Sequence, residues 1–282
     1  MTLSGTARVA GIIGWPVAHS LSPALHGWWL NVYGIDGAYV PFAVPPEDLE
    51  AALRALPKLG MAGCNLTLPH KEAALRLADD VTPEARRIGA VNTIVVEPDG
   101  TLSGSNTDGF GFLENLRGAL PDWRADTGPA VVLGAGGAAR AVVVALLDAG
   151  APVVRLLNRT RQRADDLAAA VDGAIEVGDW PARADMLAEV ALLVNTTQLG
   201  MADQEPLELD LTKLPTTAVV NDIVYVPLIT PLLAAARARG NRVVDGLGML
   251  LHQARPGFAA WFGVEPSVTA EQHAHVLAQL RD

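Results

Sequence analysis

A glycine-rich run in the middle of the chain constrains the fold more than any other feature. It follows an apolar segment, Ala130–Leu133, that reads as a strand, and it opens an apolar helix expected over Gly137–Asp148. Glycines in such a turn permit a tight bend and close approach of a pyrophosphate, while the helix N-terminus offers N–H groups and partial positive charge. A second strand, expected at Val153–Leu157, completes the spacing of a dinucleotide-binding βαβ unit. The phosphates are therefore expected at Gly134, Ala135, Gly136, Gly137 and Ala138.

The end of that second strand indicates which dinucleotide binds. An NAD site usually has Asp or Glu there, which accepts a hydrogen bond from the ribose 2′-hydroxyl. This chain has Arg159, with Arg161 and Arg163 close behind. Guanidinium groups fit a 2′-phosphate, and positive charge at a helix start is mildly unfavourable unless something anionic offsets it. The sequence therefore predicts NADP rather than NAD.

Strand-like and helix-like segments alternate along the whole chain, and the pattern starts afresh near Asp108. With 282 residues, half of them apolar, the chain has material for two cores. The alternation predicts an α/β protein of two domains. We expect an N-terminal α/β domain over residues 1–106, completed by C-terminal helices over 246–282, and a Rossmann-type domain over 107–245 with helices on both faces of a parallel sheet. In the first domain, Ser22 is expected to cap a helix that begins at Pro23.

Composition excludes several classes of function. The formal net charge of −10 disfavours nucleic acid and anionic membranes as partners, although local basic groups still allow an anionic small substrate. Cys64 is the only cysteine, so no intrachain disulfide is expected, and a small buried residue is expected there. No apolar run approaches the roughly 20 residues of a membrane-spanning helix, which predicts a cytoplasmic protein. His273 and His275 would point to different faces of a helix, so no metal site is expected.

Two charged residues on predicted loops suggest proton transfer. Lys71 follows the turn at Pro69 where a helix is expected to start, and Asp108 lies in a Thr-Asp-Gly turn. Hydride transfer to a ketone builds negative charge on oxygen, which an ammonium group can stabilise while donating the proton. A nearby carboxylate would favour the ammonium form and orient it. A redox cofactor beside this pair indicates reversible oxidation of an alcohol.

Seven short motifs, in a fixed order, carry a resemblance to a known family. They are His19-Ser20-Leu21-Ser22-Pro23, Asn65 to Glu72, Gly89-Ala90-Val91-Asn92-Thr93, Asn106 to Gly109, Gly134 to Arg140, Asn158-Arg159-Thr160 and Asp245-Gly246-Leu247-Gly248-Met249. In these motifs the chain resembles the shikimate dehydrogenases over nearly its whole length. The resemblance implies NADPH-dependent reduction of 3-dehydroshikimate to shikimate, a step toward aromatic amino acids, in a cleft between a substrate domain and an NADP domain.

The resemblance also implies roles for individual residues. Lys71 would be the general acid/base with Asp108 as its partner, and Tyr225 would close over the substrate. The substrate carboxylate would be held by Ser20 and Ser22. The ring hydroxyls would be bound by Thr67, Lys71, Asn92, Asp108 and Gln253. Besides the glycine-rich run, NADP would be held by Asn158, Arg159, Thr160 and Arg163. The nicotinamide would be flanked by Ile223, Gly246 and Met249.

Three alternative functions stay open at this point. An NAD-dependent quinate/shikimate dehydrogenase shares the Lys/Asp pair, but retention of Ser22 and Thr67 together with Arg159 favours shikimate and NADP. A non-catalytic sensor on the same scaffold would be expected to have lost Lys71 or Asp108. Another two-domain NADP enzyme, such as a folate or glutamyl-tRNA reductase, does not account for the His19 to Pro23 motif. His70 replaces a phenylalanine that is common in the family, and its side chain is expected to have a packing role. The protein is expected to be a monomer or a homodimer.

Overall fold

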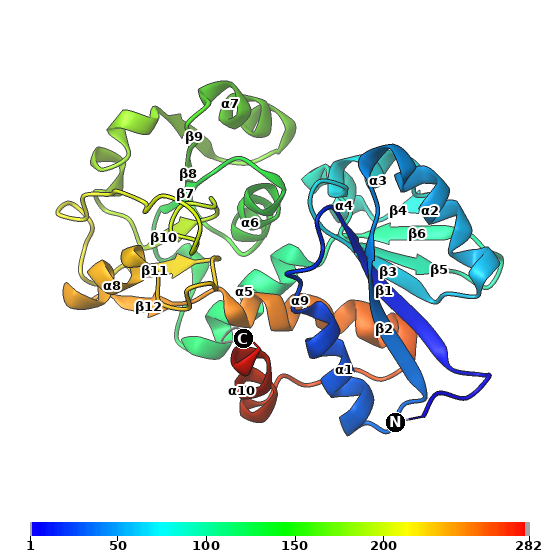
Figure 1. Ribbon diagram of the computed structural model, residues 1–282. Helices are drawn as coiled ribbons and strands as arrows, with labels where there is room; N and C mark the ends of the chain where they lie inside the picture. The colour runs from blue at the N-terminus through cyan, green and yellow to red at the C-terminus, as the bar shows by residue number, and fades with distance from the viewer. Residues whose placement is uncertain (1, 280–282) are drawn as a thin grey trace. The chain divides into compact units, whose positions relative to one another are not determined.

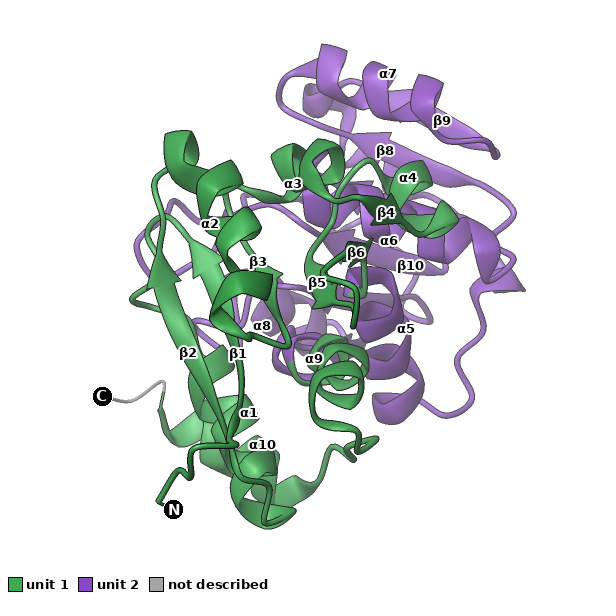
Figure 2. Cartoon of the chain, turned by 90° about the vertical axis from the view of Figure 1, so that its right-hand side faces the viewer, with its two compact units in different colours: residues 1–107, 251–282 green, residues 108–250 purple. Residues whose placement is uncertain are grey.

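The computed structural model describes residues 2–279, and the chain divides into two compact units. Unit 1 comprises residues 1–107 and 251–282, and unit 2 comprises residues 108–250 (Figure 2). Each unit contains one six-stranded sheet covered by helices. The predicted two-domain α/β class is therefore confirmed. None of the helices in the described residues is both long enough and apolar enough to span a membrane.

Unit 1 has a mixed sheet in the order β2-β1-β3-β5-β6-β4 (Figure 1). Its strands are β1 (Arg8–Gly14), β2 (Gly37–Ala43), β3 (Gly63–Leu66), β4 (Asp80–Val81), β5 (Thr93–Val96) and β6 (Leu102–Ser105). β1 pairs in parallel with β2 and β3, whereas β5 runs antiparallel to β3 and β6. β5 and β6 form a hairpin around a turn at Pro98-Asp99-Gly100, and so short a connection can join only antiparallel strands.

A cluster of aliphatic side chains holds three helices against one face of this sheet. Unit 1 contains the helices α1 (Ser22–Val32), α2 (Leu49–Ala55), α3 (Lys71–Leu77), α4 (Pro83–Ile88), residues 251–262 of α9 (Leu247–Phe262) and α10 (Ala270–Ala278), with short 3-10 turns η1 (Pro46–Asp48) and η2 (Pro57–Leu59). An aliphatic cluster that includes Leu53, Cys64 and Ile94 packs α2, α3 and α4 on one face. Cys64 is fully buried, as predicted, and burial raises the pKa of its thiol to about 12.

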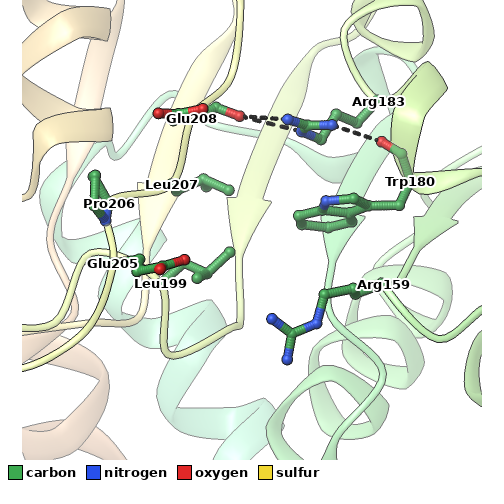
Figure 3. A pocket seen from close by; sticks show the side chains of 8 residues that line it. All are labelled: Arg159, Trp180, Arg183, Leu199, Glu205, Pro206, Leu207 and Glu208. Atoms are coloured by element: carbon green, nitrogen blue, oxygen red, sulfur yellow. Dashed lines mark hydrogen bonds between the residues drawn. The ribbon is translucent and has the colours of Figure 1, made fainter.

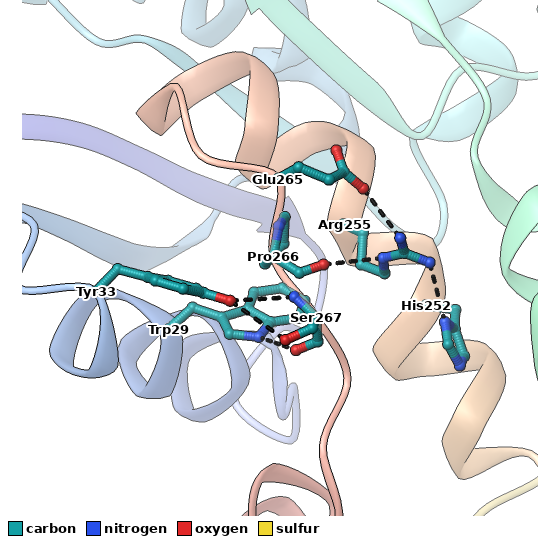
Figure 4. Close-up of polar contacts among 7 residues, drawn as sticks. All are labelled: Trp29, Tyr33, His252, Arg255, Glu265, Pro266 and Ser267. Atoms are coloured by element: carbon teal, nitrogen blue, oxygen red, sulfur yellow. Dashed lines mark hydrogen bonds and ion pairs between the residues drawn. The ribbon is translucent and has the colours of Figure 1, made fainter.

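Polar contacts fasten the C-terminal segment of unit 1 to α1 and α9 (Figure 4). The indole Nε1 of Trp29 donates to the carbonyl of Ser267 at 3.0 Å, and the Tyr33 hydroxyl accepts from the Ser267 N–H at 3.1 Å. Arg255 donates to the Pro266 carbonyl at 3.0 Å and pairs with Glu265 at 3.1 Å. The segment between α9 and α10 therefore belongs to the same core as the N-terminal helix, although more than 200 residues separate them in sequence.

Gly63 gives the first testable prediction. Its φ is +149°, and a Cβ there would lie 2.1 Å from the Ile94 carbonyl oxygen and 2.3 Å from the Trp261 Nε1, two atoms that are hydrogen-bonded to each other. Gly63→Ala must break this buried bond and strain the backbone, so we expect a loss of roughly 3 kcal/mol or more in the free energy of unfolding. Urea unfolding measures it. Gly34→Ala is the control, because φ there is +63° with no atom near the added Cβ, and should cost only about 1 kcal/mol. Equal losses would contradict the steric argument.

Unit 2 has a fully parallel sheet in the order β12-β11-β10-β7-β8-β9. Its strands are β7 (Ala130–Leu133), β8 (Val154–Leu157), β9 (Ile175–Gly178), β10 (Leu192–Asn195), β11 (Val219–Asp222) and β12 (Arg242–Val244). Its helices are α5 (Asp108–Ala119), α6 (Gly137–Asp148), α7 (Arg161–Ala170) and α8 (Pro231–Ala238), with 3-10 turns η3 (Ala125–Thr127), η4 (Trp180–Ala182) and η5 (Asp185–Leu187). The predicted parallel sheet of the Rossmann type is confirmed, and β9 is a strand that the sequence did not indicate.

Candidate active site

The topology of unit 1 gathers the predicted substrate residues at one edge of its sheet. β1, β3 and β6 end at this edge, whereas the antiparallel β5 begins there. Ser20 and Ser22 follow β1, Thr67 and Lys71 follow β3, and Asn92 immediately precedes β5. Backbone bonds confirm that these segments are neighbours: the Leu66 N–H donates to the Asn92 carbonyl at 2.8 Å, and the Val91 N–H donates to the Lys71 carbonyl at 2.9 Å.

The structure corrects the predicted capping role of Ser22. Helix α1 already includes Ser22, and the preceding Leu21 makes no side-chain cap. Instead, the Ser20 hydroxyl accepts from the Ser22 N–H at 3.3 Å, and the Ser22 side chain is buried. The hydroxyl that accepts a hydrogen bond from a backbone N–H at this helix start therefore belongs to Ser20 rather than to Ser22.

Asn65 continues this network and is a residue that sequence reasoning placed in a motif without giving it a role. Its Oδ1 accepts from the Tyr39 hydroxyl at 2.7 Å, and its Nδ2 donates to the Asn92 carbonyl and the Thr93 hydroxyl, each at 3.1 Å. The feature that could have indicated a role is a polar carboxamide within β3, a strand whose four residues are all buried. A buried amide requires partners, and Asn65 joins Tyr39 of β2 to Asn92.

Asn92 is held in one orientation by its neighbours. Its Oδ1 accepts from the Thr107 N–H at 3.0 Å and the Thr93 hydroxyl at 2.9 Å, while its Nδ2 donates to the Thr107 hydroxyl at 3.1 Å. Asn92 is almost fully buried, with 2% of its surface exposed. A continuous chain of hydrogen bonds therefore runs from Tyr39 through Asn65 and Asn92 to Thr107, the residue that precedes Asp108.

Lys71 and Asp108 each begin a helix. Lys71, half-buried, is the first residue of α3, as predicted. Asp108 is buried and is the first residue of α5 rather than part of a turn, a position where the helix dipole favours a carboxylate. Lys71 belongs to unit 1 and Asp108 to unit 2. Gln253 is half-buried on α9, in unit 1.

His70, next to Lys71, supports the sheet edge as the sequence predicted. It is buried, and one ring nitrogen, Nε2, lies 2.9 Å from the Val44 carbonyl. Burial lowers the pKa of the imidazole, although the Val44 contact opposes this. The ring is therefore neutral at physiological pH and holds the start of α3 against the segment that follows β2.

In unit 2, the glycine-rich run leaves open space before α6. Gly134 has φ of +112°, and a Cβ on it would lie 2.6 Å from the Thr196 hydroxyl oxygen. By contrast, a Cβ on Gly136 or Gly137 would meet no atom within 4 Å. Gly136 caps α6 without any side-chain bond to the first-turn N–H groups. Packing within the protein thus explains why residue 134 is a glycine. At Gly136 and Gly137 the missing side chains instead leave room for an anion at the helix N-terminus.

The arginines after β8 divide into two kinds. Arg161 is paired with Asp179 at 2.7 Å and Asp165 at 3.5 Å. Within residues 2–279, neither the Arg159 nor the Arg163 guanidinium, both exposed, has a hydrogen-bond or ion-pair partner. Asn158 shapes this turn, since its Nδ2 donates to the Thr160 carbonyl at 2.8 Å. Two of the three arginines therefore have charge available for a ligand.

Arg159 also forms part of a cavity of about 440 Å³ (Figure 3). Trp180 and Arg183 line it from the segment after β9, and Leu207 and Glu208 line it from a later loop. The Arg183 guanidinium lies 5.1 Å above the Trp180 ring and donates to the carbonyls of Trp180 and Glu208. These contacts fix the indole as one wall of a hollow that opens beside Arg159.

The residues predicted to flank the nicotinamide lie partly together. Ile223 and Tyr225 follow β11, and a Cβ on Gly246 would lie 2.2 Å from the Ile223 carbonyl oxygen, so Gly246 is packed directly against that backbone. Tyr225 is half-buried, which raises the pKa of its phenol, and Met249 is buried on α9. Sequence reasoning gave no role to Asp222, the last residue of β11, although it is fully buried and burial raises the pKa of its carboxyl to about 6.

Comparison with known proteins shows to which family the chain is related. Residues 12–94 match the model of the shikimate dehydrogenase substrate binding domain, and residues 121–206 match that of shikimate / quinate 5-dehydrogenase. An NADP(+) shikimate dehydrogenase from Paramagnetospirillum magneticum is 63% identical over 98% of this chain and 100% of its own length. The Thermus thermophilus shikimate 5-dehydrogenase in complex with NADP(H) and shikimate is 40% identical, with a TM-score of 0.84 over 97% of this chain and 98% of that one.

A quinate dehydrogenase from Corynebacterium glutamicum in complex with NAD also matches, at 33% identity and a TM-score of 0.90 over 96% of this chain and 99% of that one. The backbone alone therefore does not distinguish the two substrates or the two cofactors. The extent and identity of the match to the Paramagnetospirillum protein do establish the family. The chain belongs to the shikimate dehydrogenase family.

Proposed function

We propose that this chain catalyses the reversible, NADPH-dependent reduction of 3-dehydroshikimate to shikimate, with Lys71 as general acid/base and Asp108 as its partner. The observation that supports it most is the hydrogen-bond chain from Tyr39 to Thr107, which fixes hydroxyl and amide groups at the sheet edge where Lys71 begins α3. Such fixed neutral groups suit a substrate that carries several hydroxyls and one carboxylate.

Within this proposal, unit 1 binds the substrate. The Ser20 and Ser22 hydroxyls hold the carboxylate without adding fixed charge, and Tyr225 of unit 2 closes over the ring. The remaining contacts to the ring hydroxyls come from Thr67, Lys71, Asn92, Asp108 and Gln253. The network through Asn65 explains why these groups are held in place before substrate arrives, which lowers the ordering cost of binding.

Unit 2 binds NADP, which supplies the hydride when bound. The open space at Gly136 and Gly137 fits the pyrophosphate at the α6 N-terminus, beside Gly134, Ala135 and Ala138. Arg159 and Arg163 hold the 2′-phosphate, with Asn158 and Thr160 shaping the turn. The nicotinamide lies against Ile223, Gly246 and Met249. The predicted domain limits, 1–106 with 246–282 and 107–245, a cytoplasmic location, and a monomer or homodimer remain parts of this proposal.

The proton transfer is assigned to Lys71. As hydride reaches the carbonyl carbon of the substrate, the Lys71 ammonium donates its proton to the carbonyl oxygen and becomes a neutral amine. Asp108 orients the ammonium and favours its charged form. In the reverse direction the neutral amine accepts the hydroxyl proton, so shikimate oxidation should be faster at alkaline pH.

A single assay tests the activity against its alternatives. The purified chain is offered shikimate or quinate with NADP⁺ or NAD⁺, and formation of the reduced nicotinamide is followed by absorbance. We expect the highest kcat/KM for shikimate with NADP⁺. Preference for quinate with NAD⁺ would support the quinate dehydrogenase alternative, and ligand binding without turnover would support a sensor.

Arg159 carries the prediction on cofactor choice. Arg159→Gln removes a charge-assisted contact to the 2′-phosphate, so KM for NADP⁺ should rise roughly 10- to 100-fold while kcat/KM for NAD⁺ changes little. Steady-state kinetics with both cofactors measures this. The control is Arg161→Gln, which removes the same charge two residues away from a side chain already paired with Asp179. An equal loss of kcat/KM for NADP⁺ and NAD⁺ in Arg159→Gln would argue against a 2′-phosphate role. An equal loss of kcat/KM for NADP⁺ in Arg159→Gln and Arg161→Gln would do the same.

A further inference from the structure

A single buried carboxylate, Asp222, joins three segments of unit 2. Its Oδ1 accepts from Asn195 Nδ2 at 2.9 Å and from the Val224 backbone N–H at 3.1 Å. Its Oδ2 accepts from the Thr230 hydroxyl at 2.7 Å. The residue is 0% exposed. Three donors from three different segments therefore converge on one side chain at the end of β11.

Each of the three donors controls a turn. The Asn195 side chain also bonds within its own turn, donating to the Leu199 carbonyl at 3.1 Å and accepting from Thr197 N–H at 3.0 Å. Thr230 caps α8 by accepting from the Leu233 N–H at 3.3 Å. Val224 lies between Ile223 and Tyr225, the two residues after β11 to which the proposed function gives contacts with nicotinamide and substrate.

A carboxylate suits this position because both of its oxygens accept hydrogen bonds and neither donates. Within residues 2–279, no basic side chain forms an ion pair with Asp222. Burial of a charge without an opposite charge is costly, and the three neutral donors offset only part of that cost. The role of the Asp222 carboxylate is therefore sought in the backbone segment that it holds.

We propose that Asp222 is a positioning residue, whose carboxylate fixes the Ile223–Tyr225 backbone in register with the turn after β10. The inference rests on the proposed function, since it assigns a purpose to the backbone that carries Ile223 and Tyr225. The Ile223 N–H also donates to the Asn195 carbonyl at 3.1 Å, so side-chain and backbone bonds reinforce the same alignment. Asp222 itself needs no contact with substrate or cofactor for this role.

Asp222→Ala tests the inference by removing the acceptor of all three donors. Misplacement of reacting groups by about 1 Å can lower rates by 10²-fold, so kcat should fall roughly 10- to 100-fold. Binding of adenosine 2′,5′-bisphosphate, which probes only the Arg159 end of the cofactor site, should stay within about two-fold of wild type. Asp222→Asn should recover most of kcat, because its single amide oxygen can still accept from Val224 and Asn195. If the alanine variant does not fold, Asp222→Ser replaces it in the same comparison.

Thr230→Val is the matched control, because it removes the α8 cap and one bond to the carboxylate without touching Val224. It should lower Tm while kcat stays within about three-fold of wild type. Three results would overturn the inference. They are an unchanged kcat in Asp222→Ala, a loss of kcat in Thr230→Val equal to that in Asp222→Ala, and a loss of bisphosphate affinity in Asp222→Ala as large as its loss of kcat. Wild-type turnover of shikimate separately reports on the proposed function. If wild type is inactive but binds NADP⁺, binding tests the inference in place of turnover. The Kd for NADP⁺ divided by the Kd for the bisphosphate should then be higher in Asp222→Ala than in wild type, and an unchanged ratio would overturn the inference.

Discussion

Lys71→Ala should lower kcat for shikimate oxidation by about 10²- to 10⁴-fold, the usual contribution of a positioned proton donor or acceptor. KM for shikimate should change much less, because the hydroxyl and amide groups of Ser20, Ser22, Thr67 and Asn92 are unaffected. Lys71→Arg should be nearly as inactive, since a guanidinium keeps the positive charge but does not release its proton. Steady-state kinetics with varied shikimate at saturating NADP⁺ gives both constants.

The control for this experiment is Lys58→Ala, which removes an exposed lysine from η2 of the same unit. It should leave both constants unchanged. Circular dichroism and Tm of each variant establish that the fold is intact. Turnover of Lys71→Ala within a few-fold of wild type would remove Lys71 from the mechanism.

His26→Phe should make the protein markedly more resistant to acid. His26 is fully buried between aromatic rings, stacked on Tyr39 with centroids 3.9 Å apart, and neither ring nitrogen has a hydrogen-bond partner in the described residues. Burial lowers the pKa of its imidazole from 6.5 to about 3. The unfolded chain therefore takes up a proton below pH 6.5, whereas the native state does not until about pH 3.

The sign of this effect follows from the lowered pKa. The stability that neutral His26 allows is fully present above pH 6.5 and is lost as pH falls toward 3. At pH 4.5 the loss amounts to about 3 kcal/mol, at roughly 1.4 kcal/mol for each pH unit. Urea unfolding at pH 7.5 and pH 4.5 should show that His26→Phe escapes this loss.

Comparison with wild type at each pH cancels the contributions of other groups, including the buried Asp222, whose raised pKa acts in the opposite direction over part of this range. The exposed His19 serves as the control, and His19→Gln should follow the wild-type pH dependence. Identical pH dependences for His26→Phe and wild type would mean that burial does not lower the pKa of the ring.

Features that depend on near neighbours in sequence were predicted well. The strand Ala130–Leu133 and the helix Gly137–Asp148 have the predicted limits, because apolar runs bounded by glycine, proline or polar turns define them locally. The short strands β4, β6 and β9 were not predicted. Each has between two and four residues, too few for a periodic pattern, and β4 and β9 lie at the edges of their sheets.

The candidate site could be predicted only in part, since several of its determinants are distant pairings. The Asn65 side chain bonds to residues 26 to 28 positions away, and Asp222 joins segments 27 positions apart, so neither role has a local signature. The three arginines after β8 look alike in sequence. Only the structure reveals that Arg161 is paired with Asp179, which lies eighteen residues further along the chain.

The bond between Asn92 and Thr107 limits how far the Asp108 backbone can move from the Asn92 side chain. Thr107 is anchored through its N–H to the Asn92 carboxamide, and the next peptide link leads to Asp108. Consecutive Cα atoms are only about 3.8 Å apart, so Asp108 is tethered within one residue of the substrate-side network. No motion that keeps this bond can carry the Asp108 backbone away from Asn92.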